Sequence, residues 1–124
     1  MDITAYSADL SVCAQIDPSD VQDLKTRGYR AIICNRPDDE APEQPSFAQI
    51  ASAAQASGLE ARYIPIIPGQ MGPLEVSAFG EAMQALPKPV LAYCRSGARS
   101  TTLANAALAN TALAERTTRT ETEQ

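Results

Sequence analysis

Three short apolar runs, separated by helix-type segments, constrain the fold of this chain most strongly. The runs are residues 29–34, 61–67 and 89–93, and they are rich in aliphatic and β-branched residues. Runs of this length are typical of buried strands, and the segments between them carry apolar residues at helical spacing. Strands that alternate with helices imply right-handed crossovers and a mainly parallel sheet covered by helices.

Capping residues mark where the intervening helices begin and end. Asp17 is a predicted N-cap followed by a proline at the first helical position, and Gly28 is predicted to end that helix in a left-handed conformation. Ser46 is predicted to cap a second helix, which Gly58 closes. A third helix is predicted over residues 73–86. Its expected core contacts are Leu74, Phe79, Met83 and Leu86.

Two weakly alternating segments, residues 3–6 and 10–14, predict a small hairpin at the edge of the sheet. We therefore expect an α/β fold with a mainly parallel central sheet flanked by helices. A chain of 124 residues can bury one core without disulfide bonds. We assign residues 1–113 to that single domain and residues 114–124, which are almost entirely polar, to a tail expected to be disordered.

The composition argues against several classes of function. The formal net charge of −5 argues against a nucleic-acid partner, because binding to a phosphate backbone depends on clustered Lys and Arg. No apolar run is long enough to span a bilayer, and the N-terminus lacks the basic and apolar regions of a secretory signal. Three cysteines, an odd number, fit free thiols in a reducing compartment, so we expect a cytoplasmic protein.

The chain contains no histidine, which further limits its chemistry. Cys-His and Ser-His-Asp mechanisms are excluded, and so is a zinc site built on imidazole. We expect neither a metal nor an organic cofactor. Any nucleophile in this chain must be activated by charge and by backbone dipoles.

One cysteine lies where such activation is expected. The predicted strand over residues 89–93 ends at Cys94, and a short loop then leads into a predicted helix that runs from Ser100 to about Leu113. Backbone amides at a helix N-terminus attract an anion, and the loop adds two arginines. Thiols in such positions have pKa values lowered from about 8.5 to roughly 3.5–7.5. We therefore predict a nucleophilic thiolate at Cys94, rather than a buried apolar cysteine.

The loop residues have separate predicted roles. A cation such as Arg99 is unfavourable at the positive end of a helix dipole unless an anion is bound, which favours a functional role. Arg95 either binds that anion or lies in solvent and steers it. Gly97 is expected to adopt a conformation that other residues avoid, or to allow close approach of the ligand. The predicted anion-binding set is Arg95, Ser96, Gly97, Ala98 and Ser100, with the last also a possible helix cap.

A second polar turn, Asn35-Arg36-Pro37-Asp38, follows an earlier predicted strand. Because ligands in open parallel sheets bind beyond the carboxyl ends of the strands, this turn is expected at the same edge as Cys94. Arg36 and Asp38 are expected to brace the loops, and the second is an alternative acid. Cys34 either forms a disulfide with an oxidised Cys94 or is a buried strand cysteine.

These motifs resemble the DUF442 family, also called the beta-lactamase hydrolase-like domain family, which has a tyrosine-phosphatase-like fold and a rhodanese-like active loop. The resemblance covers residues 3–108. It rests on Asn35-Arg36-Pro37-Asp38, Gln44-Pro45-Ser46, Tyr63-Ile64-Pro65 and Val90-Leu91-Ala92-Tyr93-Cys94-Arg95-Ser96-Gly97-Ala98-Arg99-Ser100, of which the last is the most specific.

The resemblance implies that Cys94 is a nucleophile and that Arg99 holds an anionic group. Members occur beside sulfide-oxidising enzymes, which implies persulfide transfer. This chain departs from the family pattern at Tyr93, where many members have histidine, and at Cys34, where asparagine is more usual.

Two features favour sulfur transfer over phosphate-ester hydrolysis. Four residues separate Cys94 from Arg99, one fewer than in tyrosine-phosphatase-like loops, and a smaller loop suits a single sulfur atom. No aspartate lies between Glu40 and Cys94 to protonate a leaving oxygen, so Glu75 or Glu81 would have to act as the acid. The predicted enzyme is a sulfurtransferase that takes sulfur from thiosulfate or a small persulfide and passes it to a thiol acceptor.

The sequence leaves two alternatives open. The first is a cysteine-dependent phosphatase that hydrolyses phosphate monoesters at the same thiolate. The second is a non-catalytic module that binds an anion or a persulfide and docks on a sulfide-oxidising enzyme. The expected partners are a small anionic sulfur donor, a thiol acceptor and such an enzyme, with neither nucleic acid nor membrane.

Overall fold

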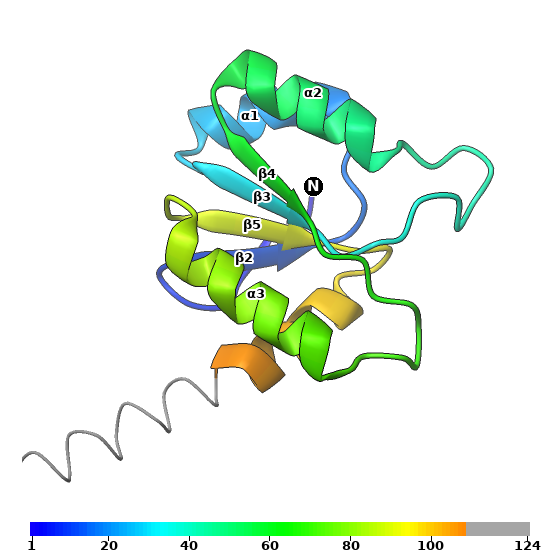
Figure 1. Ribbon diagram of the computed structural model, residues 1–124. Helices are drawn as coiled ribbons and strands as arrows, with labels where there is room; N and C mark the ends of the chain where they lie inside the picture. The colour runs from blue at the N-terminus through cyan, green and yellow to red at the C-terminus, as the bar shows by residue number, and fades with distance from the viewer. Residues whose placement is uncertain (109–124) are drawn as a thin grey trace, which may run out of the picture.

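The computed structural model describes residues 1–108, which are built around a five-stranded sheet in the order β1-β2-β5-β3-β4 (Figure 1). The strands are β1 (Thr4–Ala5), β2 (Leu10–Cys13), β3 (Ala31–Cys34), β4 (Glu60–Tyr63) and β5 (Val90–Tyr93). All neighbouring strands are parallel except β1, which pairs antiparallel with β2. β5 therefore lies in the middle of the sheet, and the chain that leaves it emerges between β2 and β3.

Helices cover both faces of this sheet. They are α1 (Val21–Thr26) with the preceding 3₁₀ helix η1 (Pro18–Asp20), α2 (Phe47–Ser57), α3 (Pro73–Ala85) and the helix of residues 98–108. Figure 1 shows α1 and α2 on one face and α3 with helix 98–108 on the other. The arrangement gives a three-layer α/β fold.

Alternate residues of β5 connect the two halves of the core. Val90 and Ala92 belong to the apolar cluster that includes residues of α3 and of helix 98–108, whereas Leu91 and Tyr93 belong to the cluster with α1 and α2. All four residues of β5 are buried. Because a strand buried on both faces has little freedom, the end of β5 is a rigid base for the loop that follows it.

The predicted α/β class, with a mainly parallel sheet flanked by helices, is confirmed. The opening hairpin and the predicted helices are also present at close to the expected positions. Ser46 caps α2 by accepting a hydrogen bond from the Gln49 amide at 3.2 Å. Gly58 ends α2 in the left-handed region with φ of 81°. The capping rules therefore predicted these boundaries well.

Two predictions about burial are wrong. The run over residues 61–67 was expected to be a buried strand, but β4 spans only Glu60–Tyr63 and most of it is exposed, because it is an edge strand that pairs with β3 alone. Leu74, in the first turn of α3, was expected in the core but is 84% exposed. The other predicted contacts of that helix, Phe79, Met83 and Leu86, are buried.

The last helix begins two residues earlier than predicted, at residue 98 rather than at Ser100. Its predicted end near Leu113 and the predicted polar tail over 114–124 lie outside the described residues. Among residues 1–108, no helix is both long enough and apolar enough to span a membrane.

Candidate active site

Cys94 lies at the carboxyl end of the sheet, immediately after β5. Its backbone amide donates to the Cys13 carbonyl of β2 at 3.4 Å, and the Asn35 amide, just past β3, donates to the Tyr93 carbonyl at 2.8 Å. Cys94 is therefore held between the ends of two neighbouring strands. Cys94 is fully buried, so the groups around its sulfur decide whether the thiol is ionised.

Backbone amides surround the Cys94 sulfur. The Gly97 amide donates to Sγ at 3.0 Å. Burial acts to raise the pKa of the Cys94 thiol, but hydrogen bonds from the amides of Ser100, Ser96, Gly97 and Arg99 outweigh it and lower the pKa below its ordinary value of 9.0. This is the physical signature of a sulfur that is stabilised as a thiolate.

Gly97 allows the loop to fold around the sulfur. Its φ of 94° lies in the region that side chains disfavour. A Cβ at this position would also lie 3.3 Å from the Cys13 carbonyl oxygen, which is tighter than an ordinary contact. The positive φ confirms the first of the two alternative expectations for this glycine, a special conformation, whereas the close approach is to β2 and not to a ligand.

Arg99 lies in the first turn of helix 98–108, with its guanidinium beside Cys94. Nη1 donates to Glu40 Oε2 at 2.7 Å and to the Ile66 carbonyl at 2.8 Å, and Nη2 donates to Glu40 Oε1 at 2.8 Å. Glu40 and then Cys94 raise the pKa of Arg99. These bonds use three of the five guanidinium N–H groups and leave the edge formed by Nε and Nη2 for an anion.

Glu40 holds two arginines at once. Besides Arg99, it accepts a hydrogen bond from Arg36 Nε at 3.0 Å, and the Arg36 side chain is only 7% exposed. Hydrogen bonds from Arg99, the largest lowering cause, and from Arg36 hold the pKa of Glu40 below its usual value. Arg36 also donates to the Gln15 side chain at 3.1 Å. Arg36 thus joins the loop after β2 to the loop after β3, and Glu40 joins the latter to Arg99 in the first turn of helix 98–108.

Asn35 and Ser100 form a second, fully buried junction. The Ser100 hydroxyl donates to Asn35 Oδ1 at 2.9 Å, and Asn35 Nδ2 donates to the Ile64 carbonyl at 2.9 Å. Ser100 therefore offers its amide to the sulfur and its hydroxyl to Asn35. Since helix 98–108 has already begun, Ser100 does not cap it, contrary to one alternative expectation.

The remaining loop residues face outward. Arg95 is exposed, and its carbonyl accepts from the Gln15 amide at 3.4 Å. The Ser96 hydroxyl accepts from the Ala98 amide at 3.3 Å and so braces the loop. Ala98 is exposed and, with Arg99, lines a cavity of about 350 Å³ next to the loop.

The other two cysteines lie at the ends of the strands on either side of β5. Cys13 and Cys34 are both opposite Tyr93 in the sheet register, and all three cysteines are free. Burial raises the pKa of Cys13 to about 12 and also raises that of Cys34. The Cys34 thiol donates to the Arg36 carbonyl at 3.3 Å. A Cys34–Cys94 disulfide stays a prediction.

Tyr93, where the family resemblance leads one to expect histidine, points to the opposite face from Val90 and Ala92. Its hydroxyl is buried and makes no hydrogen bond of standard geometry within the described residues, and the Cys34 thiol is a polar neighbour. Burial raises the pKa of Tyr93. Its phenol therefore stays neutral.

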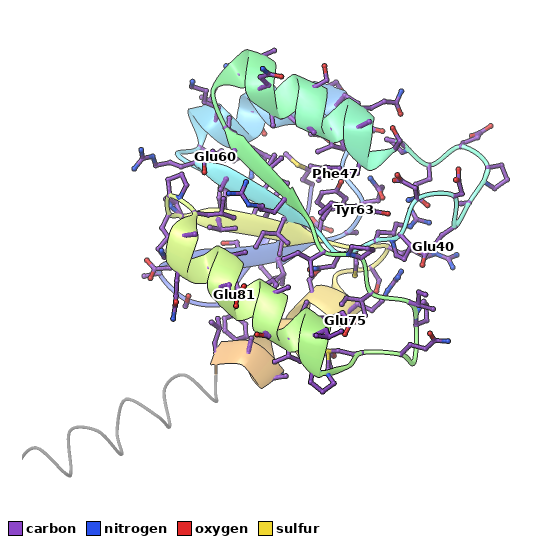
Figure 2. All side chains as sticks on the ribbon, viewed as in Figure 1. Glu40, Phe47, Glu60, Tyr63, Glu75 and Glu81 are labelled. Carbon is purple, nitrogen blue, oxygen red and sulfur yellow. The ribbon has the colours of Figure 1, made fainter. Side chains whose placement is uncertain are left out.

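The carboxylates proposed as acids are engaged elsewhere. Asp38 Oδ1 accepts from the Phe47 amide at 2.8 Å and so caps α2, and Glu75 accepts from the Gly72 amide at 3.1 Å and caps α3. Glu81 lines a groove between α3 and the far part of helix 98–108. Figure 2 shows Glu40 and Glu75 on the side toward which the strands point and Glu60 on the opposite side.

Sequence reasoning placed Cys94 and Arg99 together but missed Glu40, Asn35 and Gln15 as their supports. Arg36 and Glu40 lie four residues apart in one polar turn, which was a usable signal for their pairing. Glu40 and Arg99 lie 59 residues apart, and no local pattern relates them. Within residues 1–108, no cluster of three or more His, Cys, Asp or Glu side chains could hold a metal ion.

The fold and the cysteine–arginine loop together define a chain of the phosphatase-like class. More narrowly, residues 2–112 match the family described as "Beta-lactamase hydrolase-like protein, phosphatase-like domain", and the chain belongs to that family. The resemblance inferred from the sequence motifs is thereby confirmed.

Similar proteins agree with this assignment. A "Beta-lactamase hydrolase-like protein" of Agrobacterium fabrum is 35% identical over 94 residues, which cover 76% of this chain and 22% of that protein. Two solved structures named "putative phosphatase" also match. The one from Neisseria meningitidis is 33% identical, with a TM-score of 0.77 over 83% of this chain and 73% of that one. The one from Shewanella putrefaciens is 22% identical, with a TM-score of 0.73 over 82% and 66%, and shows the fold alone.

The chain spans less than a quarter of the length of the Agrobacterium relative. The activity of that whole protein therefore does not transfer to this domain by likeness alone.

Proposed function

We propose that this chain is a cysteine-dependent phosphatase-type enzyme in which Cys94 attacks a phosphoryl group and Arg99 binds its oxygens. The observation that supports this most strongly is the arrangement at Cys94, where four backbone amides stabilise the sulfur and lower its pKa. The Arg99 guanidinium interacts with that sulfur, and the edge that its bonds to Glu40 and Ile66 do not use matches a phosphoryl oxygen pair. This proposal departs from the expectation that sulfur transfer is the main activity, because the similar proteins favour the phosphatase alternative.

The mechanism follows from the groups at the loop. The Cys94 thiolate displaces the leaving oxygen and forms a phosphocysteine, and the bond to the leaving oxygen breaks with its electron pair. The loop amides and Arg99 stabilise the charge on the equatorial oxygens. Water then attacks the phosphorus, releases orthophosphate and restores the thiolate.

Hydrolysis of p-nitrophenyl phosphate tests the proposal. We expect turnover by the wild type, none by Cys94→Ser, and a large loss for Arg99→Lys, since lysine lacks the planar donor pair. Arg27→Lys is the matched control and should keep wild-type turnover, because Arg27 is an exposed arginine at the C-cap of α1 and not on the Cys94 loop. No turnover by the wild type, or equal turnover by Cys94→Ser, would contradict the proposal.

Sulfur transfer is the second candidate, and a specific observation favours it. The loop has four residues between Cys94 and Arg99, and the carboxylates considered as acids within residues 1–108, Asp38 and Glu75, are held by backbone amides. In that case, the partners would be a small sulfur donor and a thiol acceptor. Intact-mass measurement after thiosulfate or glutathione persulfide treatment tests it, with one added sulfur expected on wild type and none on Cys94→Ser. Uptake without transfer to any thiol would favour the binding-module alternative.

Two further expectations stay predictions. A sulfide-oxidising enzyme as partner and a cytoplasmic location both rest on the sequence and the resemblance. Co-purification of the tagged full chain and cell fractionation are the measurements that check them.

A further inference from the structure

The site raises the question of which group, if any, protonates the leaving oxygen. A phosphatase that cleaves ordinary alkyl esters needs a carboxylic acid to protonate the departing oxygen, and this contributes about 10²–10⁴-fold to the rate. Among the described residues, several carboxylates lie on the loops and helix starts beyond the strand ends, and of these Asp17, Asp39 and Glu43 are exposed to solvent. Four others are less simply placed and are the candidates for such a role. Each of these carboxylates already makes a structural contact. They are Asp20, Asp38, Glu40 and Glu75.

Three of these carboxylates cap helices. Asp20 Oδ2 accepts from the Asp17 amide at 2.8 Å at the start of η1. Glu75 accepts from the Gly72 amide at the start of α3 in the same way, and Asp38 accepts from the amide of Phe47, the first residue of α2. A side chain that moved away to protonate a leaving group would expose an unpaired helix amide at each turnover.

Glu40 is the only one of the four that contacts Arg99. Its two oxygens accept from both arginines, so no oxygen is free to carry a proton toward a substrate. The same bonds keep the pKa of Glu40 low, which holds it ionised at neutral pH. A carboxylate in this state positions Arg99 and does not donate a proton.

The shape of the surface separates Arg99 from the other carboxylates. The cavity of about 350 Å³ beside Arg99 is lined by Ile66, Gly69, Met71, Ala98 and Thr102 as well, and none of these is an acid. Asp38 and Glu75 line a different cavity of about 270 Å³, together with Pro65 and Ile67. Because Ile66 faces one cavity and its two neighbours face the other, the segment 65–67 stands between Arg99 and these two carboxylates.

We infer that this site acts on phosphoanhydrides, acyl phosphates and phosphate esters of acidic alcohols, whose leaving groups depart as stable anions without a proton. This inference rests on the proposed function and specifies its substrate class. Thiolate attack forms the S–P bond while the P–O bond breaks toward a phosphate, carboxylate or phenolate anion. Water then cleaves the S–P bond, its oxygen enters orthophosphate, and its proton is taken up by that product or by buffer. Alkyl phosphates, whose leaving alkoxides need a proton, are expected to react much more slowly, because the carboxylates Asp38, Glu40 and Glu75 are engaged in structural contacts.

A leaving-group series on the full chain tests this inference. The probes are acetyl phosphate, p-nitrophenyl phosphate, phenyl phosphate and ethyl phosphate, which carry the same phosphoryl group on increasingly basic leaving groups. We expect kcat/KM to fall along the series, with ethyl phosphate at least about 100-fold below p-nitrophenyl phosphate. Comparable kcat/KM for ethyl and p-nitrophenyl phosphate would overturn the inference.

Two conservative variants test whether Glu75 or Asp38 nevertheless protonates the leaving group. Glu75→Gln and Asp38→Asn keep the cap acceptor but remove the proton, so both are expected to leave the series unchanged. A loss of about 100-fold confined to phenyl and ethyl phosphate in either variant would identify an acid and overturn the inference. Failure of the proposed function looks different, because then p-nitrophenyl and acetyl phosphate are not turned over at all, or are turned over equally by Cys94→Ser.

Discussion

The chain carries the same side chain at the ends of three adjacent parallel strands, yet its environment differs sharply between them. Cys13 and Cys34 end β2 and β3 as buried thiols whose pKa values are raised by burial. Cys94, just past β5 and equally buried, has a lowered pKa. The difference is that the chain after Cys94 turns back at Gly97 and points its amides at the sulfur. Burial alone therefore protects a thiol, whereas burial against unpaired amides activates it.

The largest expected effect is the loss of turnover when serine replaces Cys94, compared with the same replacement at the other two cysteines. Cys94→Ser should lower p-nitrophenyl phosphate turnover by at least about 10⁴-fold, the scale seen when a nucleophile is removed. Cys13→Ser and Cys34→Ser are the matched controls at the neighbouring strand ends. They should keep activity within a few fold, measured per folded molecule by circular dichroism and steady-state kinetics. A comparable loss in either control would break the comparison.

The next largest effect tests whether Glu40, which holds Arg99, contributes separately from the backbone amides that surround the Cys94 sulfur. Glu40→Gln removes the charge that holds Arg99 and Arg36, so we expect kcat/KM to fall by about 10- to 100-fold through misplacement of Arg99. Cys94 should still ionise normally, because its amides are unaffected. Unchanged kcat/KM would show that Arg99 is positioned without this carboxylate.

Glu40→Gln should also change how the free energy of unfolding depends on pH. The folded pKa of Glu40 lies below its ordinary value of 4.5, so its contribution to stability is present above pH 4.5 and is lost as the pH falls through the folded value. We expect Glu40→Gln to cost about 1–2 kcal/mol at pH 7, an amount kept small by partial solvent screening, and less at pH 3. Urea unfolding at both pH values measures this, and an equal cost at both would contradict it.

The smallest effect concerns the contact between the loop and β2. Gly97→Ala puts a Cβ about 3.3 Å from the Cys13 carbonyl oxygen at a φ of 94°. We expect a loss of about 1–2 kcal/mol in stability, together with a rise in the Cys94 pKa as the loop shifts away from the sulfur. Gly28→Ala is a useful control, because its φ is also positive but nothing lies near the added Cβ. If both variants titrate alike at Cys94, the loop conformation is not what lowers that pKa.

Local signals carried most of what the sequence predicted. Caps at Ser46 and Gly58 set the bounds of α2, and the run that ends at Cys94 before a glycine turn and a helix identified the loop. Such features depend on residues a few positions apart. They are therefore visible without knowledge of the fold.

The sequence did not predict two kinds of feature. These are the exposure of a strand, which depends on its position in the sheet, and hydrogen bonds between side chains that are far apart in the chain. β4 has an apolar stretch beside it yet is exposed, because its place at the edge is decided by the order of all five strands. The Asn35–Ser100 junction joins residues 65 positions apart, and the Glu40–Arg99 pair joins residues 59 apart. Polar residues in loops have too many partners available for such pairs to be chosen by pattern alone.

The ionisation of Cys94 is the central claim, and a pH titration of thiolate ultraviolet absorbance tests it most directly. The difference between wild type and Cys94→Ser isolates this sulfur and does not depend on a reagent reaching a buried group. Because backbone amides stabilise the Cys94 thiolate, we predict a titration midpoint clearly below 9.0 in this difference. A midpoint at or above 9.0, as burial imposes on Cys13 and Cys34, would contradict the account.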